Sequence, residues 1–389
     1  MHRELNRKFH QVFARTGDHD LYFAPGRVNL IGEHTDYNGG HVFPCALTIG
    51  TYAVAKKRND KLLRFYSENF PEAGVIEVPL DRLEYRGEDG WANYPKGVIW
   101  VLEQEGFEID QGIDILYYGT IPHGSGLSSS ASLEVLTGFV LMDLFGFSLD
   151  FVKLALLCQQ AENKFIGVNC GIMDQFAVAM GRKGQAIFLD TADLSYEYAP
   201  LELKDAKLVI MNTNKRRGLE ASEYNKRRGE CEEALAQLQK VIQIPSLGAF
   251  TEEEFDRYQA YITDPIQRKR ARHAVYENRR TIRAVDALMQ HDIPLFGRLM
   301  TESNQSLKED YEVTGIELDT LVEAALRQEG VFGARMTGAG FGGCAISIVK
   351  EDCLEKFIQT VGKEYKDRIG HEASFYVVEA GDGPTAIRY

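Results

Sequence analysis

The chain lacks the features that mark secreted, membrane-spanning and nucleic-acid-binding proteins. Its six cysteines include no C-x-x-C pair, so neither a zinc site nor a secreted disulfide scaffold is indicated. No apolar run reaches the about 18 residues that a membrane helix needs, and the N-terminus has no signal-peptide core. A positive charge excess is missing too: the formal net charge of −13 argues against nucleic acid or anionic membranes as main partners. We expect a monomeric cytoplasmic protein that acts on small molecules.

The length and the order of the predicted elements indicate two domains. A chain of 389 residues with 44% hydrophobic residues can build two sizeable cores. Strand-like patterns dominate the first half, whereas long helical patterns dominate after residue 213. This segregation predicts the α+β class, with domains at 1–205 and 206–389. A basic helical stretch at 268–283 is interpreted as a solvated face that pairs with nearby acids.

One glycine- and serine-rich segment is the most informative part of the chain. Residues 122–132 read PHGSGLSSSAS and are followed by Leu133, Leu136, Val140 and Leu144 at helical spacing. This pattern predicts a loop that enters a helix near Ser130. A helix N-terminus offers free N–H groups and a positive dipole end, which suit a phosphate. The segment is no Walker A loop, and a merely flexible Gly/Ser loop is the alternative.

A second segment, 25–36, reads PGRVNLIGEHTD and is interpreted as a loop dense in hydrogen-bonding groups. A metal site built from Glu33, His34 and Asp36 is one hypothesis, but no second histidine stands at a ligand spacing. Recognition of a polyhydroxylated molecule explains the set better. Carboxylates accept from hydroxyls, an imidazole can donate or accept, and the small Thr35 leaves room.

Two carboxylates and a last glycine loop complete the candidates. Glu162 lies on a mostly apolar helix face, where a carboxylate is costly unless it is paired or bound to a cation. Asp174 lies near a predicted helix start, although a first-turn Asp can simply favour the helix dipole. Residues 336–344 read MTGAGFGGC, which implies close backbone approach to a ligand or to another part of the fold.

Together, and in this order, the three segments resemble the three signature motifs of the galacto-, homoserine-, mevalonate- and phosphomevalonate-kinase (GHMP) superfamily. Residues 26–37 are more narrowly similar to the galactokinase signature. The likeness continues through 162–163, 171–175 and 222–225 and covers nearly the whole chain. It implies a ribosomal-protein-S5-like N-terminal domain and a ferredoxin-like C-terminal domain with the active site in the cleft between them.

The resemblance also implies an activity and a set of residues. The activity is ATP-dependent phosphorylation of the anomeric hydroxyl of D-galactose, giving α-D-galactose 1-phosphate. By matched position, the nucleotide would contact Ser67, Gly124, Ser125, Gly126, Leu127, Ser128, Ser129 and Ser130. Ser130 and Glu162 would hold Mg²⁺. The sugar would contact Glu33, His34, Thr35, Asp36, Gly171, Asp174 and Tyr224.

Catalysis is assigned by the same resemblance to Arg27, which would neutralise charge on the transferred group, and to Asp174, which would orient the sugar hydroxyl and accept its proton. A free Asp has a pKa of about 3.9, far below that of a sugar hydroxyl. Whether Asp174 is a true base or an electrostatic positioner therefore stays open. Three alternatives remain: an N-acetylgalactosamine kinase, a non-catalytic sensor of sugar and nucleotide, and a metalloprotein that uses His34 and Asp36.

Overall fold

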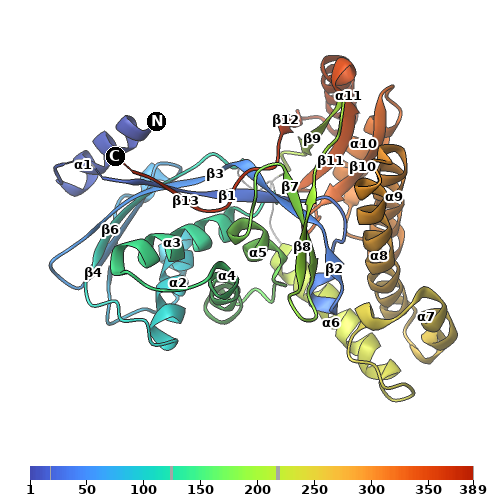
Figure 1. Ribbon diagram of the computed structural model, residues 1–389, viewed down its shortest axis with the longest axis horizontal. Helices are drawn as coiled ribbons and strands as arrows, with labels where there is room; N and C mark the ends of the chain where they lie inside the picture. The colour runs from blue at the N-terminus through green and yellow to red at the C-terminus, as the bar shows by residue number, and fades with distance from the viewer. Residues whose placement is uncertain (18, 123–125, 216–219, 389) are drawn as a thin grey trace.

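A six-stranded sheet forms the framework of the N-terminal half of the molecule (Figure 1). The computed structural model describes residues 1–17, 19–122, 126–215 and 220–388. The sheet order is β13-β1-β3-β6-β4-β5. The strands are β1 Leu21–Asn29, β3 Pro44–Lys57, β4 Leu62–Ser67, β5 Ile76–Pro79, β6 Ile113–Gly119 and β13 Thr385–Ile387. Neighbours are antiparallel except β4 and β6, which run parallel.

Strand β1 corrects one sequence-based prediction. The segment from Pro25 to Asn29, interpreted above as part of a loop, continues β1 and pairs with β3. The register shifts between Pro25 and Arg27, because a bulge accommodates a residue that cannot donate to the ladder. The bulge matters for the site, since Arg27 lies directly after it.

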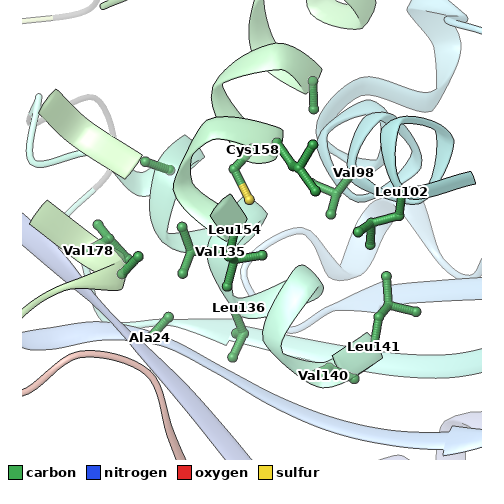
Figure 2. Close-up of a cluster of buried hydrophobic side chains, with 14 of the residues drawn as sticks. Ala24, Val98, Leu102, Val135, Leu136, Val140, Leu141, Leu154, Cys158 and Val178 are labelled. Atoms are coloured by element: carbon green, nitrogen blue, oxygen red, sulfur yellow. The ribbon is translucent and has the colours of Figure 1, made fainter. Parts of the chain in front are cut away.

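Four helices cover one face of this sheet and bury its main core. They are α2 Asn93–Gln104, α3 Ser129–Phe145, α4 Phe151–Gln160 and α5 Met173–Ala179. Figure 2 shows Leu136 and Val140 of α3 between the sheet and the neighbouring helices. Each fully buried aliphatic side chain contributes about 1.5–3 kcal/mol. Helix α3 begins at Ser129, as the sequence predicts, and its packing fixes the glycine- and serine-rich segment in space.

Helix α1, His2–Phe13, packs on the other face of the same sheet. Phe9 and Phe13 are buried there against Val54 and Leu116 of strands β3 and β6. The covering is partial, and Figure 1 shows α1 at the end of the sheet away from the C-terminal half. Helix α1 therefore stabilises the sheet far from the candidate site.

A four-stranded antiparallel sheet organises the C-terminal half, in the order β10-β11-β9-β12. Its strands are β9 Ala206–Asn212, β10 Val331–Thr337, β11 Cys344–Lys350 and β12 Ser374–Val378. The helices of this half are α6 Glu220–Leu238, α7 Glu252–Tyr258, α8 Pro265–Met289, α9 Ile293–Ser306, α10 Gly315–Leu326 and α11 Leu354–Ile369. A third, small sheet contains β2 His41–Val42, β7 Gln185–Asp190 and β8 Tyr196–Pro200. The loop between β10 and β11 is the last glycine-rich segment of the sequence analysis.

The two halves share a core. Val28 and Phe43 belong to the same buried cluster as Ile210 and Phe296, and strand β13 returns from the end of the chain to pair with β1. We propose residue 205 as the domain boundary because β9, the first strand of the second sheet, begins at Ala206. The shared core makes this a tightly packed pair of domains rather than two linked bodies.

The basic stretch at 268–283 is paired with acids, as expected, but it is not the solvated face that the sequence suggested, because Arg270 and Arg280 are buried. Arg270 forms ion pairs with Glu230 and Glu312, and Arg283 lies 3.3 Å from a carboxylate oxygen of Glu252. These contacts tie α8 to its neighbours instead of leaving a free basic surface. Within the described ranges, no helix has the length and apolarity to cross a membrane.

Candidate active site

A pocket of about 300 Å³ lies where the sequence-predicted motifs meet. Strand β1, the start of α3, the start of α5, helix α6 and the β10–β11 loop all contribute side chains to it. The lining residues include Arg27, His34, Asp36, Tyr94, Gly126, Ser128, Ser129, Ser130, Glu162, Cys170, Gly171, Asp174, Tyr224 and Gly338. Three carboxylates and one guanidinium are among them, so the wall has an acidic balance.

Arg27 and Asp174 form a bidentate ion pair in this wall. The Nε and Nη2 atoms of Arg27 donate to the two carboxylate oxygens of Asp174 at 2.8 and 2.7 Å, and the Ser128 hydroxyl donates to Oδ2 at 2.5 Å. Burial opposes the charge on Arg27, but the Asp174 carboxylate outweighs burial and raises the guanidinium pKa. Arg27 is thus charged, and its planar guanidinium fixes the orientation of the carboxylate.

The same arginine holds the glycine- and serine-rich segment. Arg27 Nη1 donates to the Gly126 carbonyl at 2.6 Å, and its backbone N–H donates to the Leu127 carbonyl at 3.2 Å. Ser132 makes the first backbone hydrogen bond of α3, to Ser128. The N–H groups of the preceding turn therefore have no intrahelical acceptor and are available to an anion.

Glu162 occupies a π-helical turn, Ala161–Ile166, that follows α4. It is 8% exposed, and burial together with the nearby Asp174 raises its pKa to about 7. Hydrogen bonds from Gln175 and Ser130 act in the opposite direction. The structure therefore brings Glu162 and Ser130 together, as the predicted cation site requires.

The Asp36 carboxylate lies in close contact with the backbone of Gly171. A Cβ at Gly171 would lie 1.9 Å from the Asp36 carboxylate, so only glycine allows this approach. The Met173 N–H donates to Asp36 at 3.3 Å. Burial, with a smaller contribution from Asp174, raises the Asp36 pKa to about 6. Both residues line the pocket beside Asp174.

His34 lines the pocket with both ring nitrogens already engaged. Its Nε2 lies 3.2 Å from the Ala339 carbonyl, so this nitrogen carries the proton, and Nδ1 accepts from the Tyr37 hydroxyl at 2.7 Å. Burial, followed by the nearby His273, lowers the His34 pKa to about 3, which leaves the ring neutral. Its ring centroid lies 5.5 Å from that of Tyr224, so His34 offers the pocket a ring surface rather than a free nitrogen.

Glu33 and Thr35 differ from the sequence-based prediction, because their side chains point away from the pocket wall. Both are fully buried. Glu33 accepts from the Gly338 N–H at 2.5 Å and lies 3.4 Å from Arg335. The Thr35 hydroxyl contacts the carbonyl oxygens of Gly32 and His41. Neither side chain lines the pocket; they hold the loop and its neighbour in place.

The β10–β11 loop closes the pocket at Gly338. This residue has a φ of +81°, a conformation that favours glycine, and a Cβ there would lie 2.8 Å from the Gly126 carbonyl. The two glycine-rich segments are thus in direct contact, and Glu33 anchors one of them. The sequence analysis expected close backbone approach at this loop, and the structure confirms it.

A second pocket, of about 230 Å³, adjoins the first. Tyr94, Ser129 and Ser130 line both pockets. Ser67 lies in the second pocket, as predicted for a nucleotide contact, together with Phe70, Trp91 and Tyr117. The ring centroids of Trp91 and Tyr117 are 5.7 Å apart in an edge-to-face arrangement. An aromatic pocket of this kind suits a flat base.

Comparisons with known proteins agree with this arrangement. Three family profiles match the chain: the galactokinase galactose-binding signature at 7–57, the GHMP kinases N terminal domain at 93–182 and the GHMP kinases C terminal at 284–367. A galactokinase of Clostridium beijerinckii is 57% identical over 383 residues, which are 98% of each chain. A galactokinase of Fusobacterium nucleatum is 55% identical over 389 residues, 100% of each chain. This chain belongs to the galactokinase family.

Solved structures confirm the galactokinase fold. Lactococcus lactis galactokinase, solved in complex with galactose, superposes with a TM-score of 0.97 at 52% identity, covering 98% of this chain and 99% of that one. The mevalonate kinase of Methanococcus jannaschii has a TM-score of 0.66 at 19% identity, covering 95% of this chain and 100% of that one, and shares the fold alone. The two-domain GHMP kinase fold that the resemblance implied is therefore confirmed.

Most of the sequence-predicted residues of this galactokinase meet in the two pockets, with a few exceptions. The Leu127 side chain is fully buried in the core, so only its backbone reaches the site. Gly124 and Ser125 lie outside the described residues. The metal site predicted from Glu33, His34 and Asp36 is not supported: the described parts of the chain contain no group of three potential metal-binding side chains.

Sequence reasoning missed the aromatic pocket of the galactokinase and two buried side chains beside Glu162. Trp91 and Phe70 follow no motif, and a half-buried aromatic has no sequence signature of its own. Glu134 and Gln175 are fully buried next to Glu162. Gln175 follows Asp174 directly, so its place in the same motif was the one signal that could have found it.

Proposed function

We propose that Arg27 and Asp174 carry out phosphoryl transfer in this galactokinase, which phosphorylates galactose with ATP. The observation that carries the assignment is the bidentate Arg27–Asp174 pair, which Ser128 completes at the start of α3. It places a fixed carboxylate and a buried guanidinium between a phosphate-binding helix start and a pocket rich in hydrogen-bonding groups.

The nucleotide occupies the second pocket and the start of α3 in this proposal. The base stacks among Trp91, Phe70 and Tyr117, with Ser67 at the pocket wall. The triphosphate then follows the 124–130 segment toward the first pocket. The free N–H groups and the dipole of α3 stabilise its negative charge, and Leu127 contributes only backbone atoms.

The sugar occupies the first pocket, where Asp36, Gly171, Asp174 and Tyr224 surround it. Asp36 and Asp174 accept hydrogen bonds from sugar hydroxyls, and the His34 ring forms part of the wall. Glu33 and Thr35 support the pocket from behind by holding the loops. The acceptor is the anomeric hydroxyl, and the product is α-D-galactose 1-phosphate.

The residues present fit Mg²⁺. Ser130 and Glu162 supply the hard oxygen ligands that this ion prefers, and Mg²⁺ commonly keeps several waters. The described lining residues include three carboxylates, of Glu162, Asp174 and Asp36, but one guanidinium, that of Arg27. Because a triphosphate adds further negative charge to this pocket, its binding requires an added cation. When bound, the ion would neutralise phosphate charge.

The chain's own residues then position the reaction. Asp174 accepts a hydrogen bond from the acceptor hydroxyl, and the hydroxyl oxygen forms a bond to the γ-phosphorus while the bond to ADP breaks. Because a carboxylate is a much weaker base than an alkoxide, the proton reaches Asp174 late, after most of the old bond has broken. Arg27, held at Gly126, stabilises charge on the transferred group.

We also propose that one chain forms a complete site in a reducing compartment such as the cytoplasm. The residues assigned to sugar, nucleotide and cation line two adjoining pockets of this chain. All six cysteines are free, which is typical of proteins kept in reducing surroundings.

One assay tests the proposal. ATP consumption is measured at a series of Mg²⁺ concentrations with D-galactose, D-glucose, N-acetylgalactosamine or no sugar. The product is identified by ³¹P NMR. We expect turnover with galactose, an anomeric phosphate as the product, and no turnover after chelation of the metal. Preference for N-acetylgalactosamine, or binding of both ligands without turnover, would establish one of the alternatives instead.

A further inference from the structure

We propose that Gln175 is a positioning residue that holds the Glu162 carboxylate in the orientation needed to bind the cation, with Glu134 as its anchor. The inference rests on the proposed role of Glu162. Gln175 Nε2 donates to Glu162 Oε2 at 2.7 Å and to Glu134 Oε2 at 3.0 Å. A side-chain amide nitrogen has two hydrogens, so one group joins both carboxylates.

The bridge connects three separate helical elements. Glu134 lies on α3, Glu162 on the π-helical turn after α4, and Gln175 on α5 next to Asp174. Gln175 and Glu134 are fully buried, and Glu162 is 8% exposed. Of the three, only Glu162 reaches the pocket. The two hidden side chains can therefore affect the reaction only through Glu162 or through packing.

The chemistry of the bridge is specific to an amide. Two buried carboxylates this close repel each other, and a donor to each of them offsets the repulsion. A methionine would fill a similar volume but would leave both oxygens without this donor. With Oε2 held by Gln175, the Glu162 carboxylate loses rotational freedom while it remains in contact with Ser130 and the pocket. Such outer contacts typically change metal affinity by about 10- to 100-fold.

A purely structural role explains the bridge less well. Within the described part of the chain, the carbonyl oxygen of Gln175 is buried without a hydrogen-bond partner. Unpaired buried polar atoms destabilise a fold, and an apolar pair of similar size would avoid them. Such an atom beside a pocket carboxylate points to a functional reason for keeping this polar group.

The test measures metal affinity directly. Mn²⁺ is titrated into the protein with a non-hydrolysable ATP analogue, and free Mn²⁺ is followed by EPR; the Mg²⁺ dependence of kcat and the KM for galactose are measured in parallel. For Gln175→Met we expect metal affinity to fall by at least about tenfold, kcat to recover largely at high Mg²⁺, and the KM for galactose to stay unchanged. Gln159→Met on α4 is the control, because among the described residues this amide donates to the Cys170 carbonyl, at 3.2 Å, and not to a carboxylate. The metal affinity of this control variant should not change.

A second variant provides a rescue. Glu134 lies within hydrogen-bonding reach of Glu162, and burial followed by the nearby Glu162 raises the pKa of Glu134 well above its usual range. Adding Glu134→Gln to Gln175→Met therefore supplies Glu162 with an amide donor that does not depend on pH. We expect this double variant to regain part of the metal affinity. If Gln175→Met does not fold, Gln175→Asn replaces it, since the shorter amide cannot span both carboxylates, and the same loss is expected.

The outcomes separate this inference from the proposed function. Unchanged Mn²⁺ affinity in the Gln175 variants, together with a loss in Glu162→Gln, would overturn the positioning role and leave the proposed cation site intact. Unchanged affinity in Glu162→Gln would overturn the cation role of Glu162 and this inference with it. A rise in the KM for galactose without any change in metal affinity would show that Gln175 acts through packing.

Discussion

Replacing Asp174 by Asn tests the central ion pair most directly. In the native protein the Asp174 carboxylate accepts three hydrogen bonds, two from Arg27 and one from Ser128. An amide keeps the shape but has only one oxygen to accept with, and its NH₂ group faces another donor. The variant therefore loses charge, geometry and the partner of a buried arginine at once.

The structure indicates how much stability and how much kcat the Asp174→Asn variant should lose. Arg27 is 3% exposed, and removing one partner of a buried ion pair costs about 3–5 kcal/mol of stability. The Asp174 side chain is 30% exposed, so water can reach the site, and we expect the lower end, about 3 kcal/mol. Loss of a positioned acid–base group lowers kcat by about 100- to 10,000-fold. Galactose binding should persist, because the other polar groups of the pocket remain.

Steady-state kinetics measures kcat, calorimetric titration measures galactose binding, and urea unfolding measures the free energy of unfolding. The control is Asp143→Asn, which removes another bidentate partner, of the exposed Arg388, outside the pocket lining. Asp143 also accepts from the Tyr22 hydroxyl at 2.6 Å, so the variant should cost more than an exposed ion pair alone but less than Asp174→Asn, with normal kcat. The double variant Arg27→Met, Asp174→Asn should regain stability but not activity. Near-normal kcat in Asp174→Asn would refute the catalytic assignment.

Three further predictions concern the sugar pocket. Gly171→Ala places a Cβ 1.9 Å from the Asp36 carboxylate and should displace that carboxylate. We expect the KM for galactose to rise by about tenfold or more, with a smaller change in kcat. An unchanged KM would contradict a contact between Asp36 and the sugar. Because the folded-state pKa of Asp36 is raised to about 6, the native protein retains a proton that the unfolded chain releases near pH 4. The contribution of Asp36 to the free energy of unfolding should therefore decrease as the pH rises from about 4 to about 6. Urea unfolding of Asp36→Asn over the same pH range should not show this decrease. Tyr224→Phe should lower the galactose-to-glucose ratio of kcat/KM, chiefly by weakening galactose, because a lost hydrogen bond to the sugar costs about 1–3 kcal/mol; a constant ratio would exclude Tyr224 as a specificity contact.

Local chemistry was the part of the site that the sequence could predict. The spacing of Leu136 and Val140 and the glycines before Ser128 locate the start of α3 within about a residue, because helix periodicity and capping depend on neighbours a few positions away. The same locality made β1 hard to predict: Pro25 and Gly26 indicate a turn, and only pairing with β3 shows that a bulge accommodates them.

Side-chain partners distant in the chain were decided by the tertiary structure alone. The sequence identified Glu33 and His34 as polar groups beside a sugar, but Arg335 and Gly338 turn Glu33 inward, and Tyr37 and Ala339 occupy both nitrogens of His34. The aromatic pocket and the Gln175 bridge likewise form between elements that no local pattern relates. Residue types determine which hydrogen bonds a side chain can make, whereas burial and the nearest partner, set by packing across the whole chain, determine which of them it does make.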